Sequence, residues 1–96
     1  MKAPKIGEHA KVYLPGESPW AECVEILPDG TWIGRIDNTL FAESQKLRED
    51  FARQEGQPEA LPSLHNFKKD DLVTFTLERG DNWECWIPAE PAGGRA

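Results

Sequence analysis

The chain has 96 residues, of which 39% are hydrophobic and 29% charged, and its formal net charge is −6. This composition is typical of one globular domain and excludes an intrinsically disordered chain. The acidic balance argues against a surface that binds nucleic acid directly, because such a surface needs clustered Lys and Arg.

The acidic residues are spread evenly along the chain. Residues 1–41, 42–60 and 61–96 each carry two more acidic than basic side chains, which favours solubility as the reason for the charge. No segment has the apolar length of a membrane span, and residues 1–5 lack the apolar stretch of a signal peptide. We therefore expect a cytoplasmic protein that does not contact a membrane.

The first half of the chain predicts three strands. Residues 9–14, 20–27 and 31–37 are short runs rich in β-branched and aromatic side chains. Pro28-Asp29-Gly30 between the second and third runs is a strong turn signal, so these two runs form a hairpin. Gly34 inside the third run predicts a bulge, or a bend where the sheet coils.

The period changes from two to that of a helix over residues 40–56. Leu40, Leu47 and Phe51 fall on one helical stripe, and Gly56 is a typical C-terminal stop. Because the stripe is narrow, we expect this helix to lie over one edge or end of a sheet.

Two further strands, 72–78 and 83–87, follow a surface connection over residues 57–63. The expected fold is mainly β: a small, five-stranded, partly open barrel of the SH3-like type with one inserted helix. Residues 1–88 form its single domain, and residues 89–96, rich in Ala, Gly and Pro, form a flexible tail.

Three segments carry a family resemblance: Trp-x-Glu-x-Val from Trp20, Gly-x-Ile-x-Asn from Gly34, and Lys-x-Asp-Asp-x-Val-x-Phe from Lys68. The chain resembles a group of small bacterial proteins of unknown function, some of which look like immunity or interaction proteins. The chain departs from that pattern at Asp70, where the group usually has Gly, which is tolerable if that turn does not need a positive φ. It departs again in a longer connection over residues 40–63. The resemblance implies the SH3-like fold rather than an activity.

No catalytic, cofactor or metal site is predicted. His9 and His65 flank the helical segment without a nucleophile motif, so both are expected to be surface or turn histidines. Cys23 and Cys85 lack the spacing of a zinc site and are expected to be packing thiols, with a disulfide as the alternative if their hairpins adjoin. We expect a protein that is not an enzyme; only a pocket that converges on His9 or His65 with carboxylates would make an enzyme a candidate again.

The tryptophans are the feature most suggestive of function. Trp83 and Trp86 are three residues apart, so in a strand they point to opposite faces. An outward Trp either packs under the helix or belongs to an exposed aromatic patch, and such patches mark recognition surfaces. The hypothesis is a non-catalytic protein-interaction module that binds an unknown protein or peptide, as a monomer or weak homodimer. The predicted contact residues are Trp20, Trp32, Trp83 and Trp86, with Phe41 and Phe51 as a secondary surface.

An alternative function is an acidic decoy that inhibits a nucleic-acid-binding protein, as phage or immunity proteins do. It requires acidic side chains aligned on one face of the molecule. The residues that would form this face are Glu43, Glu49, Asp50, Glu55 and Glu59.

Overall fold

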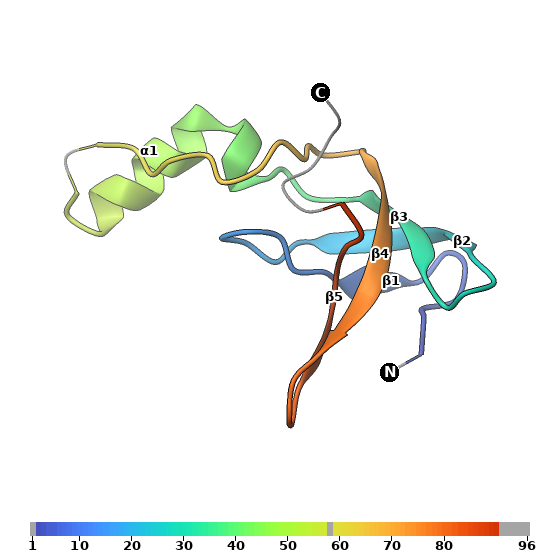
Figure 1. The fold of residues 1–96 in the computed structure, drawn as a ribbon. Coiled ribbons are helices and arrows are strands. Elements are labelled where there is room, and N and C mark those ends of the chain that lie inside the picture. The colour runs from blue at the N-terminus through green and yellow to red at the C-terminus, as the bar shows by residue number, and fades with distance from the viewer. Residues whose placement is uncertain (1, 58, 91–96) are drawn as a thin grey trace.

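The computed structural model describes residues 2–57 and 59–90, and its centre is one antiparallel sheet (Figure 1). Its five strands are hydrogen-bonded in chain order, β1-β2-β3-β4-β5. The strands are β1 (His9–Lys11), β2 (Trp20–Ile26), β3 (Trp32–Ile36), β4 (Leu72–Arg79) and β5 (Glu84–Pro88). The prediction of a mainly β chain with five strands and one helix is confirmed.

The β2–β3 hairpin forms around the predicted Pro-Asp-Gly turn. Gly30 has φ +91°, and the Asp29 carboxylate accepts hydrogen bonds from the backbone and hydroxyl of Thr31 at 3.0 and 2.6 Å. The irregularity predicted at Gly34 lies in the partner strand, between Cys23 and Glu25. Gly34 is nevertheless required, because a Cβ there would lie 2.5 Å from the Trp32 ring.

The two ends of the sheet approach each other just beyond β1. Val12 forms a parallel bridge with Trp86 of β5, and the backbone N–H of Tyr13 donates to the Trp86 carbonyl at 2.9 Å. Otherwise the sheet is open, with β1 and β5 as its outer strands.

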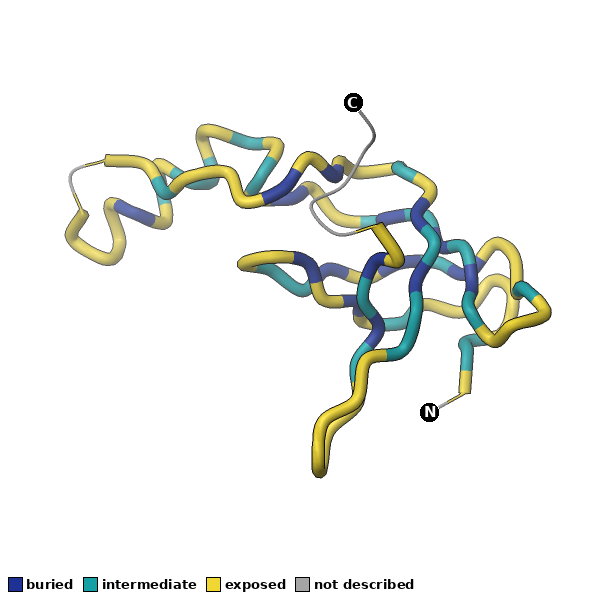
Figure 2. The backbone as a smooth tube through the Cα atoms, in the orientation of Figure 1, coloured by how far each residue is buried: buried dark blue, intermediate teal, exposed yellow. Residues whose placement is uncertain are grey.

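The core is built largely on the strands of this sheet, where buried residues are dark blue in Figure 2. In β3, Trp32, Gly34 and Ile36 are buried and the residues between them are partly exposed, as the period of two requires. The buried core cluster consists of Val12, Leu14, Ala21, Cys23, Trp32, Ile36, Leu40, Phe67, Val73, Phe75 and Trp86.

The helical insertion consists of the short 3-10 helix η1 (Phe41–Glu43) and α1 (Gln45–Gln54). The Ser44 hydroxyl accepts from the Leu47 N–H at the start of α1. Beyond its end Gly56 has φ +75°, as its role as a stop predicts. However, α1 projects beyond the end of the sheet instead of covering it (Figure 1). The physical reason is that α1 has too little apolar surface to cover a sheet, since Leu47, Phe51 and Ala52 are its three apolar residues.

The turn before β4 requires a positive φ at Asp70. From the sequence, Asp in place of the usual Gly was expected to be tolerable only if this turn did not need one. Asp70 has φ +72°, and its N–H donates to the Ile36 carbonyl at 2.7 Å. Asp tolerates this left-handed conformation better than most residues. Its carboxylate also accepts from Arg35 at 2.8 Å, so the turn is held by a side-chain contact that Gly could not make.

At the C-terminal end, the N–H of Ala89 donates to the Thr74 carbonyl at 2.8 Å. The rest of the predicted flexible tail, residues 91–96, lies outside the described residues. Over the described part of the chain, no helix is both long and apolar enough to cross a membrane.

Candidate functional site

Two of the four predicted Trp contacts are core residues. Trp32 is fully buried and Trp86 is 5% exposed. The Trp32 ring packs against Phe75 at a centroid distance of 4.9 Å and meets Trp86 edge to face at 5.7 Å. The prediction that Trp32 and Trp86 present a contact surface is therefore wrong, because the sheet curls and encloses both rings.

The other two, Trp20 and Trp83, are half exposed in different parts of the sheet. Trp20 begins β2, and Trp83 lies in the turn between β4 and β5. Trp83 packs against its own turn: a Cβ on Gly80 would lie 2.1 Å from the indole nitrogen, and the Gly80 N–H donates to the Trp83 carbonyl. A cavity lies beside α1, and neither Trp20 nor Trp83 lines it. The expectation that an outward Trp packs under the helix is therefore not met at this cavity.

Phe41 and Phe51, by contrast, lie together. Their rings meet edge to face at 5.6 Å, and each side chain remains about two-fifths exposed (38% and 40%). Both line an open cavity of about 250 Å³, which we call the α1 cavity. Its wall is formed by Pro15, Gly16, Glu17, Phe41, Ala42, Arg48, Phe51, Leu61, Pro62 and Leu64.

Four separate segments build the α1 cavity: the loop after β1, η1, α1 and the returning chain at 61–64. The loop and the returning chain fit closely at Gly16, where φ is +80° and an added Cβ would lie 2.7 Å from Leu64 Cδ1. Leu64 itself is 54% exposed. The result is a hollow with aromatic, Leu and Pro walls that open to solvent.

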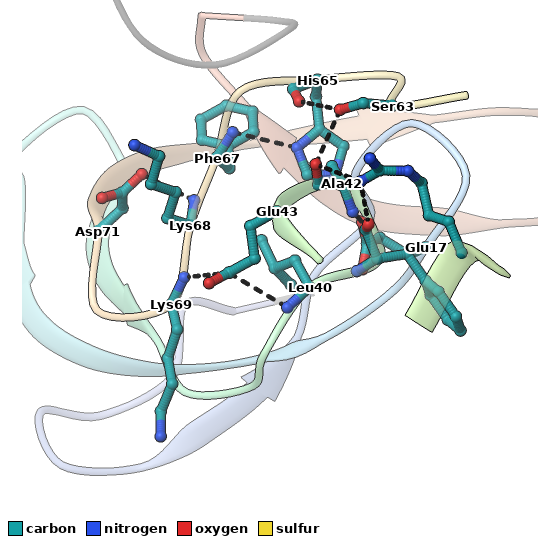
Figure 3. A network of polar contacts seen from close by, with 12 residues as sticks. Glu17, Leu40, Ala42, Glu43, Ser63, His65, Phe67, Lys68, Lys69 and Asp71 are labelled. Carbon is teal, nitrogen blue, oxygen red and sulfur yellow. Dashed lines mark hydrogen bonds and ion pairs between the residues drawn. The ribbon is translucent and has the colours of Figure 1, made fainter. Parts of the chain in front are cut away.

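Glu17 joins the loop after β1 to η1 and to His65 (Figure 3). One carboxylate oxygen accepts from the Phe41 N–H at 2.8 Å, and the other accepts from the Ala42 N–H at 3.1 Å. The second oxygen also lies 2.7 Å from Nε2 of His65. Because the side chain is only 10% exposed, Glu17 acts as an internal anchor for the start of η1.

His65 completes this anchor. Its side chain is fully buried, and Nδ1 accepts from the Phe67 N–H at 3.1 Å, so the ring hydrogen resides on Nε2 and is donated to Glu17. Neither ring nitrogen is left to accept a proton from a substrate. The prediction of a surface or turn histidine is wrong for His65; its burial depends on Glu17, 48 residues away in the chain.

Arg48 forms the cationic part of the α1 cavity wall. Its Nη1 donates to the carbonyls of Phe41 and Ala42, both at 2.8 Å. Its Nε is buried without a hydrogen-bond partner, and no carboxylate of the described residues lies within ion-pair distance of it.

Glu43, one of the five residues proposed for an acidic face, binds two backbone groups. The Glu43 carboxylate accepts from the N–H groups of Leu40 and Lys69 at 3.2 and 2.6 Å. At about 100° per residue, Glu49, Asp50 and Glu55 would point in three different directions around a helical axis. These acids therefore do not form a single stripe along α1.

A polar cluster covers the outer face of the sheet. Arg35 donates to Glu22 at 2.7 Å and to Asp70 at 2.8 Å. His9, which is exposed as predicted, lies 2.8 Å from the Asp37 carboxylate, and this hydrogen bond lowers the pKa of Asp37 below its usual value. Each charged group of the cluster has at least one partner within it.

Cys23 and Cys85 are free thiols. Burial raises the pKa of each thiol above the usual value. Their strands, β2 and β5, are not neighbours in the sheet order. Within residues 2–57 and 59–90, no group of three or more His, Cys, Asp or Glu side chains is arranged as a metal site.

Sequence reasoning missed Glu17, Arg48, Leu61 and Leu64. The available signal was Leu61-Pro62-Ser63-Leu64, an apolar stretch in a connection otherwise expected to be a polar surface loop. No family model matches the chain, and neither the curated proteins nor the solved structures contain a match.

Proposed function

We propose that the protein is a non-catalytic interaction module that binds a short apolar segment of another protein in the α1 cavity. The observation that carries the proposal is the open cluster of Phe41, Phe51 and Leu64, each between 38% and 54% exposed around one hollow. Burying apolar surface contributes about 25 cal/mol per Å², so covering such side chains is a source of binding energy. The proposed contact surface is thus centred on Phe41 and Phe51, which were predicted from the sequence as a secondary surface only.

The construction of the cavity favours binding with little rearrangement. Glu17 and His65 fix the start of η1 to the chain on both sides of it. Preorganised walls reduce the entropy lost on association.

A volume of about 250 Å³ is below the roughly 300–1,000 Å³ of typical small-molecule sites. It suits one or two apolar side chains of a protein. A non-catalytic role is further supported by His65, whose two nitrogens are both engaged internally.

We also propose that the sheet is an SH3-like barrel of the kind implied by the bacterial family resemblance. The consecutive strand order and the Val12–Trp86 bridge between the two ends support it. A cytoplasmic location and a partner other than nucleic acid are part of the same proposal, and the net charge of −6 supports the latter.

The test is partner recovery from the native host with tagged wild type, Phe51→Ser and Trp20→Ser, each checked for folding. Phe51 and Trp20 are similarly exposed, at 40% and 49%, but Phe51 alone lines the α1 cavity. We expect a protein partner to be lost with Phe51→Ser and kept with Trp20→Ser. Loss with Trp20→Ser alone would move the binding surface to the outer face of the sheet and refute the proposal.

A further inference from the structure

The two charged residues of the α1 cavity differ in how far their polar atoms are hydrogen-bonded, and this difference identifies the ligand more closely. Among its lining residues, Glu17 and Arg48 carry charge. The Glu17 carboxylate already accepts from three donors, the N–H groups of Phe41 and Ala42 and Nε2 of His65. Both of its oxygens are therefore already engaged in hydrogen bonds inside the protein.

Arg48 differs from the other described arginines. Arg35, Arg53 and Arg79 each have a carboxylate partner, at 2.7, 3.1 and 3.6 Å. Arg48 has only two backbone carbonyls, both on Nη1, and its Nε is buried with no acceptor. Since a guanidinium carries five N–H donors, the cavity wall holds a cation without a counter-charge.

We infer that the α1 cavity binds the C-terminal residue of a partner chain, with an apolar side chain among Phe41, Phe51 and Leu64 and its free carboxylate at Arg48. This inference rests on the proposed function. A terminal residue carries its side chain and its carboxylate on the same Cα, so both reach one cavity of about 250 Å³. Charge-assisted hydrogen bonds from Arg to a carboxylate are among the strongest in proteins.

The field of the whole molecule adds a second requirement on the partner. At a net charge of −6, the protein repels a ligand that is acidic overall. The terminus bound at Arg48 is therefore preceded by neutral or basic residues.

The test compares two N-acetylated tetrapeptides, Gly-Lys-Gly-Leu, with a free C-terminal carboxylate in one and an amide in the other. Their dissociation constants are measured by NMR titration, using the backbone amides of Phe41, Ala42 and Leu64 as reporters. The proteins are wild type, Arg48→Gln and Arg48→Lys. The readout is the ratio of the two dissociation constants within each protein, which cancels any general damage to the cavity from loss of the Arg48 hydrogen bonds.

For wild type we expect the free acid to bind about tenfold more tightly than the amide, the size of one charge-assisted hydrogen bond. The ratio should fall to about one in Arg48→Gln and be largely kept in Arg48→Lys. Equal binding of acid and amide at these amides of wild type would overturn the inference while leaving the interaction module intact. A ratio that survives in Arg48→Gln, or no perturbation by either peptide, would also overturn it; the partner-recovery experiment then judges the proposed function separately.

Discussion

Nε2 of His65 lies 2.7 Å from the carboxylate of Glu17, and both side chains are nearly excluded from solvent. The pair joins the loop after β1 to the chain that returns from α1, and the same carboxylate receives the first N–H groups of η1. The α1 cavity is thus built around one buried carboxylate.

Replacing Glu17 should destabilise the protein strongly. Glu17→Ala leaves three donors without their acceptor, two of them in partly buried hydrogen bonds, and we expect a loss of about 3 kcal/mol in the free energy of unfolding. Glu17→Gln keeps one acceptor oxygen and should lose about half as much. Urea denaturation measures both, and a loss below about 1 kcal/mol for Glu17→Ala would show that water replaces the carboxylate easily.

The coupling between Glu17 and His65 can be measured directly. In a double-mutant cycle of Glu17→Gln and His65→Ala, we expect a coupling free energy of at least about 1 kcal/mol, because the two side chains share one buried hydrogen bond. Additive effects on stability would mean that the 2.7 Å contact contributes little.

The two kinds of Trp should differ in their effect on stability. Trp86→Ala removes a buried ring that packs against Trp32 and should cost about 3–5 kcal/mol. Trp20→Ala removes a half-exposed ring and should cost less than about 1 kcal/mol. Thermal and urea denaturation distinguish these values, and equal losses would contradict the assignment of Trp86 to the core and Trp20 to the surface.

Asp70 offers a matched test of backbone conformation. At φ +72°, Asp70→Ala should be less stable than Asp70→Gly by about 1 kcal/mol. Both variants lose the same exposed ion pair with Arg35, so their difference isolates the backbone. If the alanine variant is as stable as the glycine variant, the turn does not hold a positive φ.

The Asp37 carboxyl should titrate at an abnormally low pH. The hydrogen bond from His9 lowers its pKa below the ordinary value of 3.8, so its small contribution to stability is complete above that pH and is lost as the pH falls through the lowered pKa. In His9→Ala, an NMR titration should show the pKa of Asp37 rising toward its ordinary value. The rise should be incomplete, because Arg35 still lowers this pKa. An unchanged titration would remove His9 as the principal cause.

Period and turn chemistry were sufficient to predict the five strands and the part of the chain that contains the helix, although not its place beside the sheet. Pro28-Asp29-Gly30 and Gly56 act through local backbone preferences, which one segment contains by itself. The burial of Trp32 and Trp86 was not predictable in this way, because it depends on how far the sheet curls.

The candidate site was harder to predict because it is non-local. Phe41 and Phe51 were visible as helix-segment aromatics, but their partners Leu61 and Leu64 come from the returning chain. The distinction between Glu17, whose two oxygens are both hydrogen-bonded, and Arg48, whose Nε has no acceptor, exists only in the folded protein. Residue types alone carry no such information.

The most direct test of the central claim is photo-crosslinking in the native host with a benzophenone amino acid at position 51. The matched control carries the same group at position 26, since Ile26 is similarly exposed (45%) but does not line the α1 cavity. We expect a covalent adduct with another protein from position 51 and none from position 26, with the link near that protein's C-terminus if the cavity binds a terminal residue. An adduct from position 26 alone, or one at position 51 that contains only a second copy of this chain, would contradict the claim that the α1 cavity binds a partner protein.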